Sequence, residues 1–376
     1  SGGSLTGTAT SLTVQADDSA TVRTLAGNVA GSGGGAFGAA IAVNQVGSAV
    51  QATLTGMTLN AAPAVVVDAD MRGEIKSVAA SGAASSGASV NGSFTTNQLT
   101  ASVKAQATSV TQATNGGAFT VSADNDSDIF SLAGTISGSG AAAIGAAVAV
   151  NEMGGDVTAR VADSTLRATG ALGVTATSSG TIKSVAAGMS GGGTVALAGS
   201  NTTNALTSTV LAQLDSTNLV VNASAVNVLA RDTSSIQSFA GTVAGGGAAG
   251  GGAALALNFL GRTAGNADSS KVVKAEVLAS NVRVAGPAVV SAYSTSSIES
   301  IGVAAGASGT AAISGSNATN LLEDEITANW TGTNLSSTSS LTVSARQASN
   351  IDSLAGNVSG SLGAAVGAAV AVNRIG

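Results

Sequence analysis

The chain has 376 residues and a net charge of −6, and only 9% of its residues are charged, 2% are aromatic and 51 are glycine. It contains no cysteine and no histidine, which excludes a disulfide scaffold and removes the commonest general base and transition-metal ligand. Lysine and arginine form no cluster and aromatic residues are scarce, so a nucleic-acid-binding surface is excluded. The hydrophobic fraction of 44% argues against intrinsic disorder.

A window that starts at an aliphatic residue and ends at an asparagine recurs seven times along the chain. The starts are Val22, Ile75, Ile129, Ile182, Ile236, Ile298 and Ile351, and the ends are Asn44, Asn97, Asn151, Asn204, Asn258, Asn320 and Asn373. Both series advance by 53, 54, 53, 54, 62 and 53 residues, which is the signature of a repeat array whose units pack on their neighbours.

The repeats therefore predict one continuous array over residues 1–376, made of half-repeats of about 53 residues. The residue before the asparagine alternates between an aliphatic residue and threonine, which pairs the half-repeats into units of about 107 residues. Both ends of the chain fall in the middle of a repeat and resemble no polar cap, so we expect an internal segment of a longer polypeptide.

Each window consists mainly of glycine, alanine and serine, with charge only at its second position, as at Arg23, Lys76 and Glu299. Because ionic groups are costly to bury, we expect the window to be enclosed by protein, with that one side chain in water. The small residues predict either a thin core or a flat Ala/Gly/Ser outer surface that packs laterally on another sheet. The seven asparagines are expected at coil corners, too far apart to stack directly on one another.

Outside the windows, polar and apolar residues alternate with period two in short runs such as 157–161, 172–176, 225–230 and 341–345. Such runs, rich in Val and Thr and interrupted by Gly, Asn and Ser, predict β-strands. The predicted fold is an all-β, right-handed parallel β-solenoid with three coils of about 18 residues in each half-repeat. Two coils of about 27 residues, or a stacked antiparallel architecture with hairpins at the Gly/Ser centres, are the alternatives.

In chain order, the first candidate site is Asp124, Asp126 and Asp128, whose alternate carboxylates resemble the start of a calcium loop. The glycine and the bidentate glutamate that complete an EF-hand loop are missing, so a solvated turn is the competing interpretation. No residue is assigned to a catalytic, cofactor-binding or established metal site.

Residues 164–176, with the sequence STLRATGALGVTA, look like the coils of filamentous-haemagglutinin-type secreted exoproteins. The window from Ser131 to Asn151, with its Ser-Leu-Ala-Gly, Ser-Gly-Ser-Gly-Ala-Ala and Ala-Val-Asn segments, more closely resembles leukotoxin-type filamentous adhesins. The resemblance covers essentially the whole chain and implies a giant bacterial protein, secreted to the cell surface, with a long β-helical stalk. It supplies no catalytic residues.

Residues 233–261 carry no charge and are long enough for a membrane-spanning helix. Glycines interrupt this stretch and its pattern recurs in every repeat, so buried strand is predicted and no membrane span. The polar stretch that follows, within 262–271, accounts for most of the one longer step between repeats. Insertions in repeat arrays map to surface loops, often on the functional face.

Two further features lie near the C-terminus. Glu323, Asp324 and Glu325 form the densest acidic patch, interpreted as an exposed turn that keeps the chain soluble or, alternatively, as half of a cation site. Trp330, the only tryptophan, is a candidate for stacking on a sugar ring, although glycan sites combine several aromatic and polar groups.

The sequence thus predicts a structural β-solenoid stalk or fibre segment of a secreted bacterial adhesin or filament, acting as a rigid spacer and through lateral filament contacts. Its expected partners are neighbouring repeats of the same chain, sister filaments and cell-surface glycans. The alternative is a glycan- or matrix-binding module that uses the sides of the solenoid, with residues 262–271 as a contact. Catalysis is not expected, because charged residues are scattered and rarely recur in register.

Overall fold

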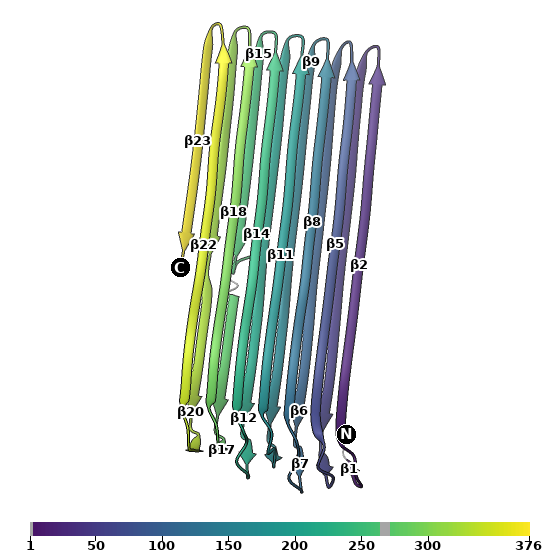
Figure 1. Ribbon diagram of the computed structural model, residues 1–376. Coiled ribbons are helices and arrows are strands. Elements are labelled where there is room, and N and C mark those ends of the chain that lie inside the picture. The colour runs from purple at the N-terminus through teal and green to yellow at the C-terminus, as the bar shows by residue number, and fades with distance from the viewer. Residues whose placement is uncertain (1–2, 264–270) are drawn as a thin grey trace.

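The computed structural model describes residues 3–263 and 271–376, which contain only β-strands and their connections. They form one parallel β-solenoid with two long sheets and one short sheet. Figure 1 shows the long strands side by side, joined at one end by narrow turns and at the other by the short strands. The predicted all-β parallel solenoid is confirmed.

The first long sheet comprises β2 (Ser11–Ser32), β5 (Ala64–Ser85), β8 (Phe119–Ser139), β11 (Leu172–Gly192), β14 (Val226–Gly246), β18 (Ala288–Ser308) and β22 (Leu341–Ser361). The second comprises β3 (Gly35–Thr55), β6 (Ala88–Thr108), β9 (Ala142–Ala162), β12 (Val195–Asp215), β15 (Ala249–Leu260), β16 (Lys271–Leu278), β19 (Ala311–Leu322), β20 (Asp324–Thr331) and β23 (Ala364–Ile375). The short sheet comprises β1 (Gly3–Leu5), β4 (Met57–Leu59), β7 (Thr111–Gln112), β10 (Thr165–Leu166), β13 (Asn218–Leu219), β17 (Asn281–Val284) and β21 (Asn334–Ser337).

The hydrogen-bonded register sets the coil length. Ile129 of β8 pairs with Ile182 of β11, which pairs in turn with Ile236 of β14, so a coil is a whole half-repeat. The predicted coil of about 18 residues is therefore wrong, because each strand of the first long sheet runs for 21 or 22 residues. The Gly/Ser clusters lie at the narrow turns between the two long sheets, as at 137–140, where β8 ends at Ser139 and β9 begins at Ala142.

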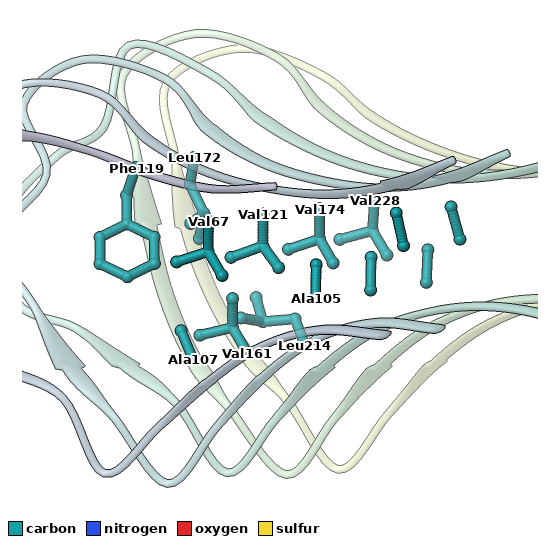
Figure 2. Close-up of a cluster of buried hydrophobic side chains, with 14 of the residues drawn as sticks. Val67, Ala105, Ala107, Phe119, Val121, Val161, Leu172, Val174, Leu214 and Val228 are labelled. Carbon is teal, nitrogen blue, oxygen red and sulfur yellow. The ribbon is translucent and has the colours of Figure 1, made fainter. Parts of the chain in front are cut away.

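The wide end of each coil, next to the short sheet, encloses an aliphatic core. Figure 2 shows Val67, Val121, Val174 and Val228 one behind another, each from the next coil. All four side chains are fully buried, and burial of a valine contributes about 1.5–3 kcal/mol. The alternation of Val, Thr and Ala in the sequence produces these rows, since every second side chain of a strand points inward.

Farther along the coil, a second buried cluster lies between the wide core and the narrow turns, and we call this part of the coil the waist. The isoleucines that start the repeated windows are buried here and face a row of Leu and Met side chains from the second long sheet. Beside them the seven asparagines form a continuous ladder, in which Nδ2 of each donates to Oδ1 of the next at 2.8 Å. The predicted corner position and the predicted lack of stacking are both wrong, because one coil per half-repeat makes these asparagines direct neighbours.

Beyond the ladder the two long sheets close into a thin arch that ends at the narrow turns. A Cβ added to Gly188 of β11 would lie 2.6 Å from the carbonyl oxygen of Gly199 in β12, so only small side chains fit between the sheets. Buried serine, alanine and glycine accordingly line the arch. This result supports the predicted thin core. The predicted flat Ala/Gly/Ser outer surface is wrong, because large apolar side chains alternate with glycine and alanine on the outside.

The arch also explains why the half-repeats are paired. In β8 and β14, Thr135 and Thr242 face Gly145 and Gly252 of the second long sheet, with hydroxyl oxygens 3.2 and 2.9 Å from where a glycine Cβ would lie. In the intervening coil the order is reversed, because Gly188 takes the register position of the threonines and Ala198 takes that of the glycines. Larger side chains thus alternate between the two sheets from coil to coil.

The corner between the second long sheet and the short sheet uses left-handed backbone. Gly56, Ser109, Asp163, Ser216, Ala279 and Gly332 occupy this corner with φ between 46° and 63°. A non-glycine residue in this conformation costs about 1–2 kcal/mol, so the corner is locally strained where glycine is absent.

Candidate interaction surface

The outer side of the arch in the first long sheet carries two rows of apolar side chains. We name this surface the apolar face. Its first ridge is Leu25, Val78, Leu132, Val185, Phe239, Ile301 and Leu354, and its second ridge is Val29, Gly82, Ile136, Met189, Val243, Ala305 and Val358. In-register stacking turns one apolar position of the repeat into a row that crosses the whole sheet.

Two rows of small residues run parallel to the ridges and form grooves. One lies between the ridges (Gly27, Ala80, Gly134, Ala187, Gly241, Val303 and Gly356) and the other lies next to the narrow turns (Gly31, Ala84, Gly138, Gly191, Gly245, Ala307 and Gly360). Only Val303 is larger than alanine. The face is therefore corrugated across the strands.

Ridge side chains are exposed even where their strand has a neighbour on both sides. Ile136 of β8, Met189 of β11 and Val243 of β14 are 64%, 49% and 53% exposed. Where Gly82 interrupts the second ridge, Ile136 and Met189 line an open hollow of about 680 Å³. Contiguous apolar surface of this kind marks an interaction site in a folded protein.

Charge begins at a sharp boundary next to the first ridge. The bordering row is Arg23, Lys76, Phe130, Lys183, Gln237, Glu299 and Asp352. The predicted access of this position to water is confirmed by Arg23 and Lys76, whose side chains are 70% and 48% exposed. The prediction that the rest of the window is enclosed is wrong for its outward half, which avoids charge although it faces solvent.

The outer side of the arch in the second long sheet is less uniform. Ile144, Leu197 and Ile313 form part of an exposed apolar row there. Asn201 of β12 and Asn317 of β19 interrupt a second row of large side chains, four residues farther along the strands, and each lies beside a threonine two residues on. Polar side chains therefore interrupt the apolar rows of this side, whereas none interrupts the ridges of the apolar face.

Asp124, Asp126 and Asp128 lie at successive outward positions of β8, so the predicted turn is wrong. Partial burial raises the pKa of the Asp124 and Asp128 carboxyls, an effect opposed by hydrogen bonds from Thr177 and Thr181. Among the described residues, no three acidic side chains are gathered in a group that could hold a metal ion. Calcium binding by these aspartates stays a prediction.

The acidic patch near the C-terminus is neutralised by the preceding coil. Arg262 donates to both carboxylate oxygens of Glu323 at 2.7 and 2.8 Å, which lowers the pKa of Glu323, and Lys274 lies 2.8 Å from Glu325. Asp324 begins β20 and turns inward to a buried lysine. These contacts correct the interpretation of the patch as an exposed turn, because two of its residues cross-link adjacent coils and the third lies in the core.

That buried lysine, Lys271, is the centre of a charged cluster in the core. Its Nζ lies 2.5 Å from Asp232 Oδ1 and 3.8 Å from Asp324 Oδ2, and all three side chains are fully buried. Ser294 and Ser296 accept hydrogen bonds from Lys271 and donate to Asp324 at 2.7–2.9 Å. Removing one partner of such a cluster leaves an uncompensated buried charge, which costs about 3–5 kcal/mol.

The sequence reasoning missed this cluster, although a signal was present. Asp232 lies four residues before Ile236, and residues separated by an even number share a face of a strand, so its inward direction follows from alternation. Lys271 could not be placed in the same way, because the longer step between repeats obscures its phase. Of the predicted contact within 262–271, residues 264–270 lie outside the described part of the chain.

Trp330 of β20 packs against the aliphatic core at the wide end rather than on an outer surface. The only tyrosine, Tyr293, lies in the first long sheet, where the Arg231 guanidinium is 5.9 Å from its ring centre. The two aromatic rings are therefore on different sheets, and the predicted sugar-stacking role of Trp330 is not supported by its inward position.

Residues 233–261, which carry no charge, form most of β14 and all of β15, so the predicted strand is confirmed, but its outward residues, such as Val243, are exposed. No helix in the described ranges has the length and hydropathy needed to cross a membrane. Comparisons with family models, curated proteins and solved structures gave no match to this chain.

Proposed function

We propose that the chain is a structural β-solenoid segment that acts as a rigid spacer in a secreted bacterial surface adhesin or filament. The observation that carries the proposal is the unbroken register. Every residue of β11 has a partner in β8 and in β14, and the asparagine ladder runs through all seven coils beside them. The adhesin context rests on the resemblance of the Ser131 to Asn151 window to leukotoxin-type adhesins.

The spacer would work mechanically. Each coil adds about 4.8 Å along the solenoid axis, so the number of coils sets the length of the rod. Bending the rod would stretch backbone hydrogen bonds across two long sheets at once, and the buried rows on both sides of the waist resist sliding of one coil past the next. Ion pairs such as Arg262–Glu323 and Lys274–Glu325 add cross-links between coils.

The test is to vary the number of coils. Duplication of one two-coil unit should lengthen the rod by about 10 Å in small-angle scattering or electron microscopy, with no change in width. Placed between a surface anchor and a tip domain of known ligand, the longer rod should extend the reach of the tip. A particle that widens or bends freely on duplication would contradict the spacer.

The alternative function, binding of glycan or matrix through the sides, is tested on the same chain. Replacement of residues 264–270 by a short Gly/Ser linker keeps Arg262 and Lys271, which hold internal partners. A spacer then retains surface attachment by its tip, whereas a side-binding module loses retention on immobilised glycan or matrix.

A further inference from the structure

We propose that the apolar face is a self-docking surface, on which a second copy of the chain packs face to face with its strands antiparallel to those of the first. This inference deepens the proposed function, because it names the partner and the orientation in which one stalk would join another laterally. The face is carried by residues on every coil, so the contact would extend along the whole array.

The shape of the face is self-complementary in one orientation. Along each strand the outward residues are large, small, large, small, as in Leu132, Gly134, Ile136 and Gly138. A two-fold axis in the interface, parallel to the solenoid axis, reverses this order and places each ridge of one copy in a groove of the other. A two-fold axis parallel to the strands would instead keep the strand direction and reverse the order of the coils. In that orientation each ridge of one copy would lie on a ridge of the other.

The area is sufficient for a stable dimer. Seven coils spaced about 4.8 Å apart, and about eight residues of each strand, give a face of roughly 900 Å² per copy. Specific interfaces bury about 800 Å² per partner, so the face reaches that size without further surface. The interdigitation of small and large side chains across a flat sheet is the packing seen in steric zippers.

A lipid surface fits the structure less well. A bilayer around the arch would enclose both outer sides, including Asn201 and Asn317 on the second long sheet, and a polar side chain in hydrocarbon is costly. Ridges and grooves also offer no advantage against fluid chains. The continuous face on one sheet and the interrupted one on the other indicate a one-sided partner.

The test uses two matched pairs of outward substitutions in the full chain. Ile136→Glu with Met189→Glu places two charges on the apolar face, and Ile144→Glu with Leu197→Glu places the same charges on the other side of the same two coils. Sedimentation equilibrium should show a dimer for the native chain and for the second pair, and a monomer for the first. Circular dichroism checks that both variants keep their strand content.

Gly134→Leu provides an independent test, because it fills a groove without touching the interior. An added Cβ there would meet only a Leu132 side-chain atom at 3.8 Å, so the fold has room for it while a docked ridge does not. The variant should weaken the dimer at least tenfold. The orientation is tested with a spin label on Thr194→Cys at the exposed turn, since the chain has no other cysteine. Two labels about 40 Å apart indicate antiparallel strands.

A native chain that stays monomeric at its highest soluble concentration would overturn the proposal. So would a dimer that both glutamate pairs dissociate equally, or that neither pair dissociates. Labels that lie close together would reject the antiparallel orientation. Flotation of the native chain with phosphatidylcholine vesicles, abolished by both glutamate pairs, would assign the face to lipid instead. A monomer that is still a rod of the expected length would refute self-docking and leave the spacer intact.

Discussion

Substitution of a single rung of the asparagine ladder should destabilise the array out of proportion to the atoms removed. Asn204 is fully buried; its Nδ2 donates to Ser184 Oγ at 2.7 Å and to Asn258 Oδ1 at 2.8 Å, and its Oδ1 accepts from Asn151 Nδ2 at 2.8 Å. Asn204→Ala therefore removes three hydrogen bonds. It leaves an amide hydrogen of Asn151 and the side-chain oxygen of Asn258, on the two neighbouring coils, without partners.

The magnitude follows from what is left behind. A buried polar group without a partner costs about 1–3 kcal/mol, and Ser184 can turn its hydroxyl elsewhere while the Asn151 amide hydrogen and the Asn258 oxygen cannot move away. The expected loss is about 3–5 kcal/mol in the free energy of unfolding, at the upper end for single substitutions. Asn201→Ala is the matched control, because the same amide is removed from the outward side of the same strand and should cost no more than about 0.5 kcal/mol.

Urea denaturation of the full chain measures both values. Hydrogen exchange then shows whether protection is lost first in β11, β12 and the adjoining coils, as a local break in the ladder requires. A difference of less than about 1 kcal/mol between the two variants would refute the reasoning, since it would mean that the buried amides contribute no more than exposed ones.

Three other changes test separate parts of the fold. Lys271→Met leaves Asp232 buried beside a second carboxylate without its cation, and should cost about 3–5 kcal/mol in urea denaturation; a neutral result would show that the cluster is dispensable. Ala279→Gly should stabilise, and Gly332→Ala at the equivalent corner should destabilise, each by about 1 kcal/mol in thermal unfolding, because both positions have positive φ and an added Cβ at Gly332 would make only ordinary contacts, at 3.8 Å. Effects of equal sign would contradict the corner strain. Burial raises the pKa of Asp124, so at pH values between its usual and its raised pKa the folded chain binds more protons than the unfolded chain, and the free energy of unfolding falls as the pH rises. Asp124→Asn should remove this pH dependence, measured in denaturation curves at a series of pH values. An unchanged pH dependence would assign it to other groups.

The sequence was sufficient to predict strands, the repeat and the solenoid, because period-two alternation and a constant step are local and additive signals. It was insufficient to predict the coil length. The chain does turn at Gly/Ser clusters such as 137–140, but nothing local shows that the strands on either side continue for 21 residues, well beyond the usual strand length. The error in coil length then placed Asn151 and Asn204 several coils apart, which is why the ladder was not predicted.

The site was harder to predict than the fold. In a window without charge, composition does not reveal which of two alternating faces points inward, so the sequence left open whether the small residues form a thin core or a flat outer surface. The buried pairing of Lys271 with Asp232 and Asp324 depends on which residues the longer step between repeats brings into register, and a sequence with one such step offers no second example from which to learn it.

The composition of the apolar face is not required by the fold. Sheets as close as those at Gly188 and Gly199 leave no room for large side chains inside the arch, but this constraint acts only on inward positions. Outward positions accept polar residues without harm to the architecture, because Asn201 and Asn317 occupy them on the second long sheet. The first ridge is nevertheless large and apolar in all seven coils, on a surface where solvent favours polar side chains. A preference that the fold does not demand and that water opposes points to a partner that covers this face.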